Sequence, residues 1–283
     1  ECARGGILKS GLAFQNCDVS IVTNISADHI GLGGIDSMEQ MAKVKAVVPE
    51  TTFKHGYAIL NAEDDLVYAM RDGLSCNIAL FSMDENNPRI ISHCKDGGYA
   101  AVFENGYITI MKGTWKIRVI KVIDVPVTYG GKAVHNIMNC LPAVLSTYFW
   151  RNIEIEDIRL ALQTFIPSST QTPGRLNLFQ FKHFQFLVDF AHNPAGLELL
   201  CDFVSKLDGE PKVGIISGTG DRRDEDIKEL GKISGRYFDE IIIRQDKNLR
   251  GRTAEEIVNL LVAGIKETQP KEIPIEIIYN EKE

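Results

Sequence analysis

The first hundred residues alternate between short apolar runs and stretches in which apolar residues recur with the period of a helix. Runs typical of buried strands cover residues 19–25, 56–62 and 76–83, whereas 36–48 and 64–73 have the helical period. Strands separated by helices of this length predict a parallel sheet built from βαβ units.

The helix predicted over 36–48 places a lysine among its apolar side chains. Asp36 can act as the N-cap with Glu39 three residues later, and Pro49 is expected to end the helix. At about 100° per residue, Lys45 falls inside the arc of methionine and valine side chains. A buried cation is costly, so the pattern singles out Lys45 as an amine that is either neutral or chemically changed.

From about residue 98 the period changes to strand-like alternation, interrupted by an Asn-Gly pair and then a Lys-Gly pair. Such pairs are typical of tight hairpin turns, so this region predicts an antiparallel meander inserted in, or flanking, the parallel sheet. Two apolar helices are expected next, over 135–150 and 154–165.

The most polar segment, "IPSSTQTPGR" over 166–175, is rich in proline and glycine and predicts a domain boundary. We place the first domain at 1–172 and the second at 173–283. The second repeats the βαβ order, which predicts an α/β, Rossmann-like domain. Its expected strands are 184–190, 212–218, 240–244 and 275–279, with helices near 195–207, 225–236 and 253–266.

Composition narrows the class of protein. The 283 residues are 44% hydrophobic and 24% charged, with a net charge of −7, which argues against a nucleic-acid-binding surface. No apolar run approaches the length of a membrane span, and six scattered cysteines without metal-ligand spacing indicate free thiols in a cytoplasmic protein. Because "ECARGG" lacks an initiator Met and leads into strand-like sequence, and the chain ends just after a strand, we expect a piece of a longer protein.

Polar clusters follow three of the predicted strands: "TNISADH", "DFAHNP" and "SGTGDRRDED". Each alone is typical of a turn or helix cap, but three at strand ends favour a functional site. "RGR" at 250–252 is either a solvated turn, with Thr253 capping the next helix, or a guanidinium pair for carboxylate or phosphate. The phosphate-binding pattern GxxxxGK[ST] does not occur.

Together these motifs resemble the Mur ligase family, and specifically its cyanophycin-synthesising branch. The match runs in order through "ECARGGIL", "GYAILNAEDD", "HNIMNCLPAV", "TPGRLNLF", "LVDFAHNPAG", "SGTGDRRDEDIKELG" and "DKNLRGRTAEEI". The resemblance implies the central ATPase domain without its phosphate-binding loop, followed by the C-terminal Rossmann-like domain. It also implies an ATP- and Mg²⁺-dependent amide ligase that works through an acyl phosphate and adds arginine to the β-carboxylates of an aspartate polymer.

The resemblance assigns roles to individual residues. Glu1, His29 and a carbamoylated Lys45 would bind Mg²⁺, and Asn136, Arg175 and Asp189 would contact ATP. Lys45, His29 and Asp189 would be catalytic. Substrate would meet the second domain at a further set of positions: His192, Asn193, Asp221, Arg222, Arg250 and Arg252.

The same resemblance implies partners and leaves alternatives open. The phosphate-binding loop and an ATP-grasp half would belong to the same polypeptide, so this fragment should be inactive alone, and the protein should form a homo-oligomer. No nucleic acid or membrane is expected as a partner. Another Mur-type ligase, acting on muramyl peptides or joining Asp-Arg dipeptides, is the first alternative, and a non-catalytic binding domain is the second.

Overall fold

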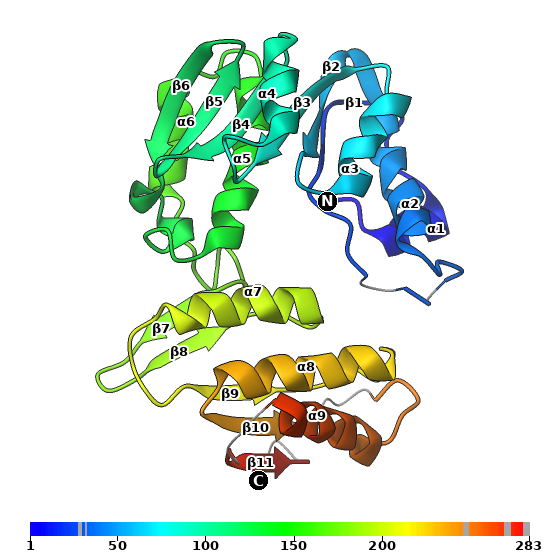
Figure 1. Cartoon of the computed structure of the whole chain (residues 1–283), viewed down its shortest axis with the longest axis vertical. Helices are drawn as coiled ribbons and strands as arrows, with labels where there is room; N and C mark the ends of the chain where they lie inside the picture. The colour runs from blue at the N-terminus through cyan, green and yellow to red at the C-terminus, as the bar shows by residue number, and fades with distance from the viewer. Residues whose placement is uncertain (28–29, 32, 246–248, 269–272, 280–283) are drawn as a thin grey trace. The chain divides into compact units, whose positions relative to one another are not determined.

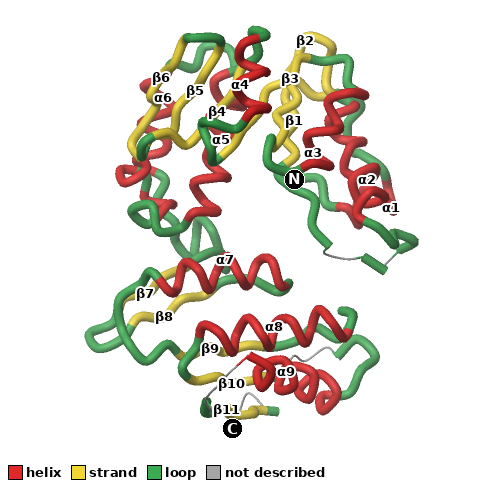
Figure 2. Tube along the Cα trace, in the orientation of Figure 1, coloured by secondary structure: helices red, strands yellow, loops and turns green. Residues whose placement is uncertain are grey.

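The computed structural model of the protein describes residues 1–283 except 28–29, 32, 246–248, 269–272 and 280–283. The chain forms two compact units, Glu1–Ile166 and Pro167–Glu283, called unit 1 and unit 2 (Figure 1). The division lies within the polar segment 166–175. Each unit contains both helices and strands, so the predicted α/β class is confirmed (Figure 2).

Unit 1 is built on a six-stranded sheet in the order β1-β2-β3-β4-β5-β6. The first four strands are parallel, and β4, β5 and β6 are antiparallel neighbours, which confirms the predicted meander. Asn105-Gly106 forms the first turn, where both residues have positive φ, as the Asn-Gly pair predicts. The strands are β1 Cys17–Val22, β2 Thr52–Asn61, β3 Asn77–Ser82, β4 Tyr99–Glu104, β5 Tyr107–Lys112 and β6 Trp115–Lys121.

Helices cover both faces of this sheet because successive residues of a strand point to opposite sides. On β2, Ile59 packs with α5 and α6, whereas the next residue, Leu60, packs with α2, α3 and α4. This explains why the parallel strands have nearly continuous apolar sequences. The helices of unit 1 are α1 Arg4–Ser10, α2 Met38–Glu50, α3 Asp65–Ala69, α4 Pro88–Lys95, α5 Val134–Tyr148 and α6 Ile155–Thr164, with 3-10 turns η1 Met70–Gly73, η2 Val122–Asp124 and η3 Pro126–Thr128.

Several local predictions in unit 1 are wrong. Ser37, not Asp36, caps α2: its hydroxyl accepts the Gln40 amide and also lowers the pKa of Glu39. Pro49 does not end α2, because a proline in the last turn still adopts helical φ and the helix runs on to Glu50. The segment after "ECARGG" is α1, not a strand.

The predicted helix 64–73 is also shorter than expected. The α-helix α3 ends at Ala69, and the next residues tighten into the 3-10 turn η1. Helix α4 was missed because its apolar positions are few. Asn87 caps this helix and Pro88 occupies its first turn, a start signal that the sequence does carry.

Unit 2 contains a three-stranded parallel sheet and a separate two-stranded hairpin. Helices α7, α8 and α9 form one apolar core with β10. The strands are β7 Asn177–Gln180, β8 Gln185–Val188, β9 Val213–Ile216, β10 Glu240–Arg244 and β11 Ile275–Ile278, and the helices are α7 Pro194–Ser205, α8 Asp224–Tyr237 and α9 Ala254–Thr268.

One strand of unit 2 departs from the prediction. The run 184–190 was expected in the parallel sheet, but β8 pairs antiparallel with β7, and the parallel sheet has the order β11-β10-β9. The sequence hides this pairing because β7 is only four residues long and follows the polar segment directly. The other predicted strands and helices of unit 2 are confirmed.

Helices α8 and α9 cross in close backbone contact, which glycine makes possible. A Cβ added to Gly231 would lie 2.2 Å from the Leu261 carbonyl oxygen, and one added to Gly264 would lie 2.0 Å from the Lys228 carbonyl oxygen. Both distances are far below van der Waals contact. The crossing therefore requires glycine on both helices.

Two sequence-based expectations concern the whole chain. All six cysteines carry free thiols, as expected. Burial raises the pKa of Cys140 to about 11 and that of Cys201 to about 12, so both thiols stay protonated. Among the described helices, none is long and apolar enough to cross a membrane.

Candidate functional site

The carboxyl ends of β1, β2 and β3 lie side by side in unit 1, and polar side chains gather there. Three consecutive residues after β1 are each held by a side chain from another element. Asn61 Nδ2 donates to the Thr23 carbonyl at 2.8 Å, Lys45 Nζ donates to the Asn24 carbonyl at 2.9 Å, and Asp64 Oδ2 accepts the Ile25 amide at 2.6 Å. The path that leaves β1 toward Asp28 and His29 is thus fixed at its start.

Lys45 is half-buried rather than fully buried. The predicted arc is correct for Met41 and Ala42, which are buried in the core of α2 and the sheet. Lys45 lies at the margin of that arc, where its long side chain passes the apolar surface and places Nζ at the end of β1. The expectation that Lys45 is buried within the apolar arc is therefore wrong, but its Nζ does lie at the carboxyl edge of the sheet, where ligand sites form.

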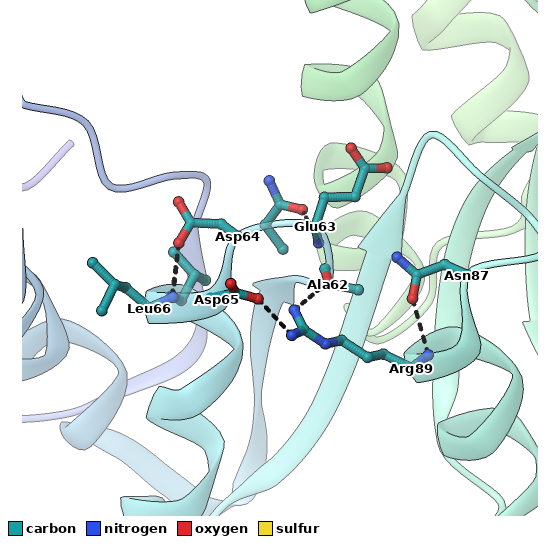
Figure 3. A network of polar contacts seen from close by, with 9 residues as sticks. Ala62, Glu63, Asp64, Asp65, Leu66, Asn87 and Arg89 are labelled. Carbon is teal, nitrogen blue, oxygen red and sulfur yellow. Dashed lines mark hydrogen bonds and ion pairs between the residues drawn. The ribbon is translucent and has the colours of Figure 1, made fainter.

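A second set of contacts stiffens the same edge (Figure 3). Arg89 donates from α4 to the Ala62 carbonyl at 2.9 Å and forms an ion pair with Asp65 at 2.5 Å. Asn87 accepts the Arg89 amide and so caps α4. Glu63 accepts the Ser82 hydroxyl at 2.7 Å, which ties the end of β2 to the end of β3. These contacts hold the strand ends without using Lys45.

We expect the Asp64→Ala variant to lose about 2 kcal/mol of unfolding free energy. Besides the Ile25 amide, the carboxylate accepts the Leu66 and Val67 amides at 3.0 Å each, so alanine leaves three N–H groups without their acceptor. Urea denaturation of the 283-residue chain measures the change. Asp72→Ala, at a 73% exposed side chain on the next turn, is the matched control and should change little. Equal effects of the two variants would contradict a clamping role for Asp64.

The other predicted residues of unit 1 are placed as follows. Asn136 lies in the first turn of α5, is half-buried, and donates its amide to the Val127 carbonyl at 2.7 Å. Glu1 is exposed ahead of α1. His29 lies outside the described residues.

In unit 2, four of the predicted residues gather where β8 leads into α7. Asp189 accepts the Leu176 amide through one oxygen and the Ala191 amide through the other, at 2.8 Å each. This carboxylate therefore joins the end of the polar segment to the end of β8. The Arg175 guanidinium lies over the Phe190 ring, 5.2 Å from its centroid, and is exposed.

The same turn continues into α7. His192 Nδ1 lies 2.9 Å from the Phe190 carbonyl, which can only accept, so Nδ1 carries the proton. Asn193 caps α7 by accepting the Gly196 amide at 2.8 Å. Arg175, Asp189, His192 and Asn193 are thus brought into one cluster, called the hairpin-exit cluster.

The remaining four predicted residues form a second cluster where the loops after β9 and β10 meet, called the arginine cluster. Arg252 Nε donates to the Gly220 carbonyl at 3.0 Å, and its NH2 group donates to the Arg222 carbonyl at 2.9 Å. Arg250 forms an ion pair with Asp221. A Cβ on Gly220 would lie 2.0 Å from the Leu249 carbonyl oxygen, so only glycine lets the two loops meet this closely.

The arginine cluster is partly withdrawn from water. Arg222 is only 8% exposed. Asp221 Oδ1 and Thr219 Oγ1 are buried and have no hydrogen-bond partner within the described residues. Such atoms are suited to receive a polar ligand, and guanidinium groups beside them are suited to carboxylates. Thr253 caps α9 reciprocally with Glu256, as expected. Arg250 is exposed, as in a solvated turn, whereas Arg252 is half-buried against the loop after β9.

Sequence reasoning about chemistry missed Asn61 and Asp64, although both lie in "NAEDD", directly after a buried strand. Asn61 is 3% exposed, and its amide oxygen also accepts the Glu63 amide at 2.8 Å. The available signal was a polar residue at the end of a continuous apolar strand. The sequence does not indicate that Asn61 would donate to the Thr23 carbonyl, which follows β1.

The described residues do not by themselves fit a magnesium site. Mg²⁺ prefers oxygen ligands, but Lys45 presents an amine that donates to a carbonyl oxygen. Of the other two predicted ligands, Glu1 is exposed and His29 lies outside the described residues. A group of three or more His, Cys, Asp or Glu side chains able to hold a metal ion does not occur in the described part of the chain.

Comparisons with known proteins agree with this architecture. The family model "Mur ligase middle domain" matches residues 1–147, and "Mur ligase, glutamate ligase domain" matches residues 174–278. Among curated proteins, cyanophycin synthetase of Synechocystis sp. is 48% identical over 270 residues, which are 95% of this chain and 31% of that protein. The likeness to the cyanophycin branch expected from the motifs is confirmed.

Solved structures confirm the fold. MurF from Acinetobacter baumannii aligns with a TM-score of 0.64 at 18% identity, covering 94% of this chain and 51% of that one. Folylpolyglutamate synthase of Mycobacterium tuberculosis, complexed with ADP and AMPPCP, aligns with a TM-score of 0.63 at 15% identity, covering 94% and 55%. The chain spans about a third of the length of the cyanophycin synthetases it matches.

Proposed function

Because the chain belongs to the Mur ligase family, we propose that it is part of an ATP-dependent amide ligase of the cyanophycin type. In this proposal the enzyme joins the α-amine of arginine to the β-carboxylate of an aspartate residue in a growing polymer. The observation that carries it is the 48% identity to a cyanophycin synthetase over 95% of the chain. The arginine cluster of unit 2 is compatible with a carboxylate substrate. The enzyme would be cytoplasmic.

The proposed chemistry has two steps. A carboxylate oxygen attacks the γ-phosphorus of ATP, so that ADP leaves and an acyl phosphate forms. The amine nitrogen then attacks the acyl carbon, phosphate leaves, and the nitrogen loses a proton to give the amide. ATP supplies the phosphoryl group, and residues of this chain bind and orient the reactants.

Each cluster has a role in this proposal. Asn136, Arg175 and Asp189 hold the nucleotide. The exposed Arg175 guanidinium has five N–H donors for phosphate oxygens, and the Asp189 carboxylate is fixed by the Leu176 amide. His192, Asn193, Asp221, Arg222, Arg250 and Arg252 hold the substrates. The phosphate-binding loop would come from the longer polypeptide, which acts as a homo-oligomer. Lys45 would join Glu1 and His29 as a magnesium ligand only as a carbamate, because its amine donates to a carbonyl oxygen.

We expect the Arg175→Ala variant of the longer protein to raise the KM for ATP about tenfold. This change corresponds to the free energy of one charge-assisted hydrogen bond to ATP. The fold should change little, because the exposed contact with Phe190 is worth about 0.5–1 kcal/mol, or a melting shift of a few degrees. Initial-rate kinetics and thermal unfolding measure the two effects. Lys182→Ala, an exposed cation at the hairpin turn, is the control. A large melting shift with unchanged KM would assign Arg175 a structural role.

The proposed function is tested by phosphate release from the longer protein supplied with ATP and Mg²⁺. We expect release that depends on both arginine and a poly-aspartate primer. Release with a muramyl peptide and a diamino acid, but not with arginine, would assign the chain to another branch of the family. Absence of release with either pair would favour a non-catalytic binding domain.

A further inference from the structure

The polar segment of unit 2 contains a tight turn that a buried side chain holds together. Asn177, the first residue of β7, is only 4% exposed although its side chain is a polar amide. Its Oδ1 accepts the Gly174 amide at 2.7 Å, and its Nδ2 donates to the Thr172 and Arg175 carbonyls at 3.0 and 3.2 Å. Both polar atoms of this side chain thus bind the backbone just before it, and we call residues 172–177 the clamped turn.

The backbone of the clamped turn adopts conformations that need such support. The Arg175 amide donates to the Thr172 carbonyl at 3.1 Å, which closes a β-turn with Pro173 and Gly174 in the middle. Gly174 has a φ of 69°, which is typical of the third residue of a type II turn. Leu176 has a φ of 44°, where a bulky residue is an outlier. A leucine in this conformation persists only where the surrounding contacts hold it.

The end of β8 holds the other side of the turn. Asp189 Oδ2 accepts the Leu176 amide at 2.8 Å, and Leu176 itself is 3% exposed. The residues on either side of Arg175 are therefore each fixed by a side chain from elsewhere in unit 2. The Arg175 guanidinium, in contrast, is exposed above the Phe190 ring. The turn thus combines a fixed backbone with an accessible cation.

A fixed backbone makes an exposed arginine a better group for binding an anion. A long side chain loses rotamer freedom when it binds, and a mobile backbone beneath it would add to that loss. Where the backbone is already fixed, only the side-chain part of the cost remains, so binding is tighter. Asn177 can give this advantage without meeting the ligand, because it is almost fully buried and its polar atoms already bind the turn.

We propose that Asn177 is a positioning residue for nucleotide binding, which holds the backbone from which Arg175 reaches ATP. The inference rests on the proposed function, in which Arg175 contacts the nucleotide. Asp189 supports the same turn, but it is also expected to meet ATP, so a change at Asp189 would mix two effects. Asn177 isolates the effect of the backbone.

The proposal is tested by a double-mutant cycle on the KM for ATP in the longer protein. Asn177→Ala should raise this KM about threefold to tenfold and change kcat by less than about twofold, because the loss is confined to binding. In the Arg175→Ala background the same change should raise KM by less than about twofold, since the side chain that Asn177 positions is gone. Gln180→Ala, at an exposed amide of the same strand, is the matched control and should leave KM unchanged. A merely structural role would lower kcat through loss of folded enzyme and leave KM as it was.

The outcomes separate this inference from the proposed function. If Arg175→Ala raises KM and Asn177→Ala does not, the positioning role is wrong while the nucleotide role of Arg175 stands. An equal effect of Asn177→Ala with and without Arg175 would show that the two residues act independently, which also overturns the inference. An unchanged KM in both single variants would remove the nucleotide role of Arg175 and the inference with it.

Hydrogen exchange followed by NMR tests the clamp without any activity. In the 283-residue chain, the Gly174 amide should exchange at least about tenfold faster in Asn177→Ala than in the parent protein. The Gly196 amide, which Asn193 holds at the start of α7, is the internal control and should exchange at the parent rate. Equal exchange of the Gly174 amide in both proteins would show that Asn177 does not hold the turn and would overturn the inference. If thermal unfolding shows that Asn177→Ala is not folded, Asn177→Ser, which leaves a hydroxyl inside the turn, takes its place in every arm.

Discussion

The Lys45→Ala variant of the longer protein should lose arginine-dependent phosphate release by at least about a hundredfold, the size of effect seen when a group that stabilises charge in a reacting site is removed. Lys45 extends from α2 to the carboxyl end of β1, and its Nζ donates to the Asn24 carbonyl at 2.9 Å. This is the point from which the chain continues to His29. Steady-state phosphate release measures the loss, and Lys43→Ala, at an exposed residue of the same helix, is the control.

Two roles of Lys45 would give this loss, and they differ in charge. In the first, the ammonium group fixes the path after β1, which is what the structure shows for the unmodified side chain. In the second, which the family resemblance implies, the neutral amine adds to CO₂. A nitrogen–carbon bond forms, a proton is released, and the resulting carbamate is an anion. A carbamate could not donate to a carbonyl oxygen through its charged end, so the local contacts would have to rearrange.

Arginine at position 45 separates these roles. Lys45→Arg keeps a long cationic donor but does not form a carbamate, so we expect it to be as stable as the parent protein and yet inactive. Short carboxylates such as acetate should partly restore the activity of Lys45→Ala by supplying the missing anion. An active arginine variant, or an alanine variant whose activity no carboxylate restores, would instead favour the ammonium–carbonyl contact as the working form.

The alternation of apolar and polar residues was enough to predict most of the fold. Buried strands such as β2 and β3 have continuous apolar sequences because both faces are covered, and the Asn-Gly turn marks the switch to antiparallel pairing. Which strands pair with each other was harder to predict from the local sequence pattern. β8 has the same kind of apolar sequence as a parallel strand, and only its partner β7, four residues long, reveals that it forms a hairpin.

In the candidate site, too, some features could be predicted from the sequence and others could not. Its strand-end residues were predictable because loops after parallel strands share one edge of a sheet, and Asp221, Arg250 and Arg252 do meet there. What could not be predicted were the long-range supports. Asn61 and Asp64 hold the exit from β1 across a gap of 38 or 39 residues, and no local pattern in the sequence indicates which carbonyl or amide they reach.

The second large effect is expected at the contact between α8 and α9, where Gly264→Ala should lower the free energy of unfolding by about 3 kcal/mol. Two terms compete. Alanine is the better helix former by about 1 kcal/mol, which would stabilise α9. Against this, its Cβ would lie 2.0 Å from the Lys228 carbonyl oxygen and 2.9 Å from the Lys232 amide nitrogen. Both are backbone atoms of α8, which cannot rotate away, so the helices must separate and the steric term prevails.

Gly5→Ala supplies the matched control for this prediction, because Gly5 lies in α1 with no atom within 4 Å of an added Cβ. There only the helix-propensity term acts, so this variant should be neutral or more stable by up to about 1 kcal/mol. Chemical denaturation of the 283-residue chain, followed by far-UV circular dichroism, measures both variants. If Gly264→Ala is as stable as Gly5→Ala, the α8–α9 crossing tolerates a methyl group, and this close backbone approach does not determine the stability of unit 2. If instead Gly264→Ala unfolds with a reduced denaturant slope, the two helices have lost their fixed packing before the strands come apart.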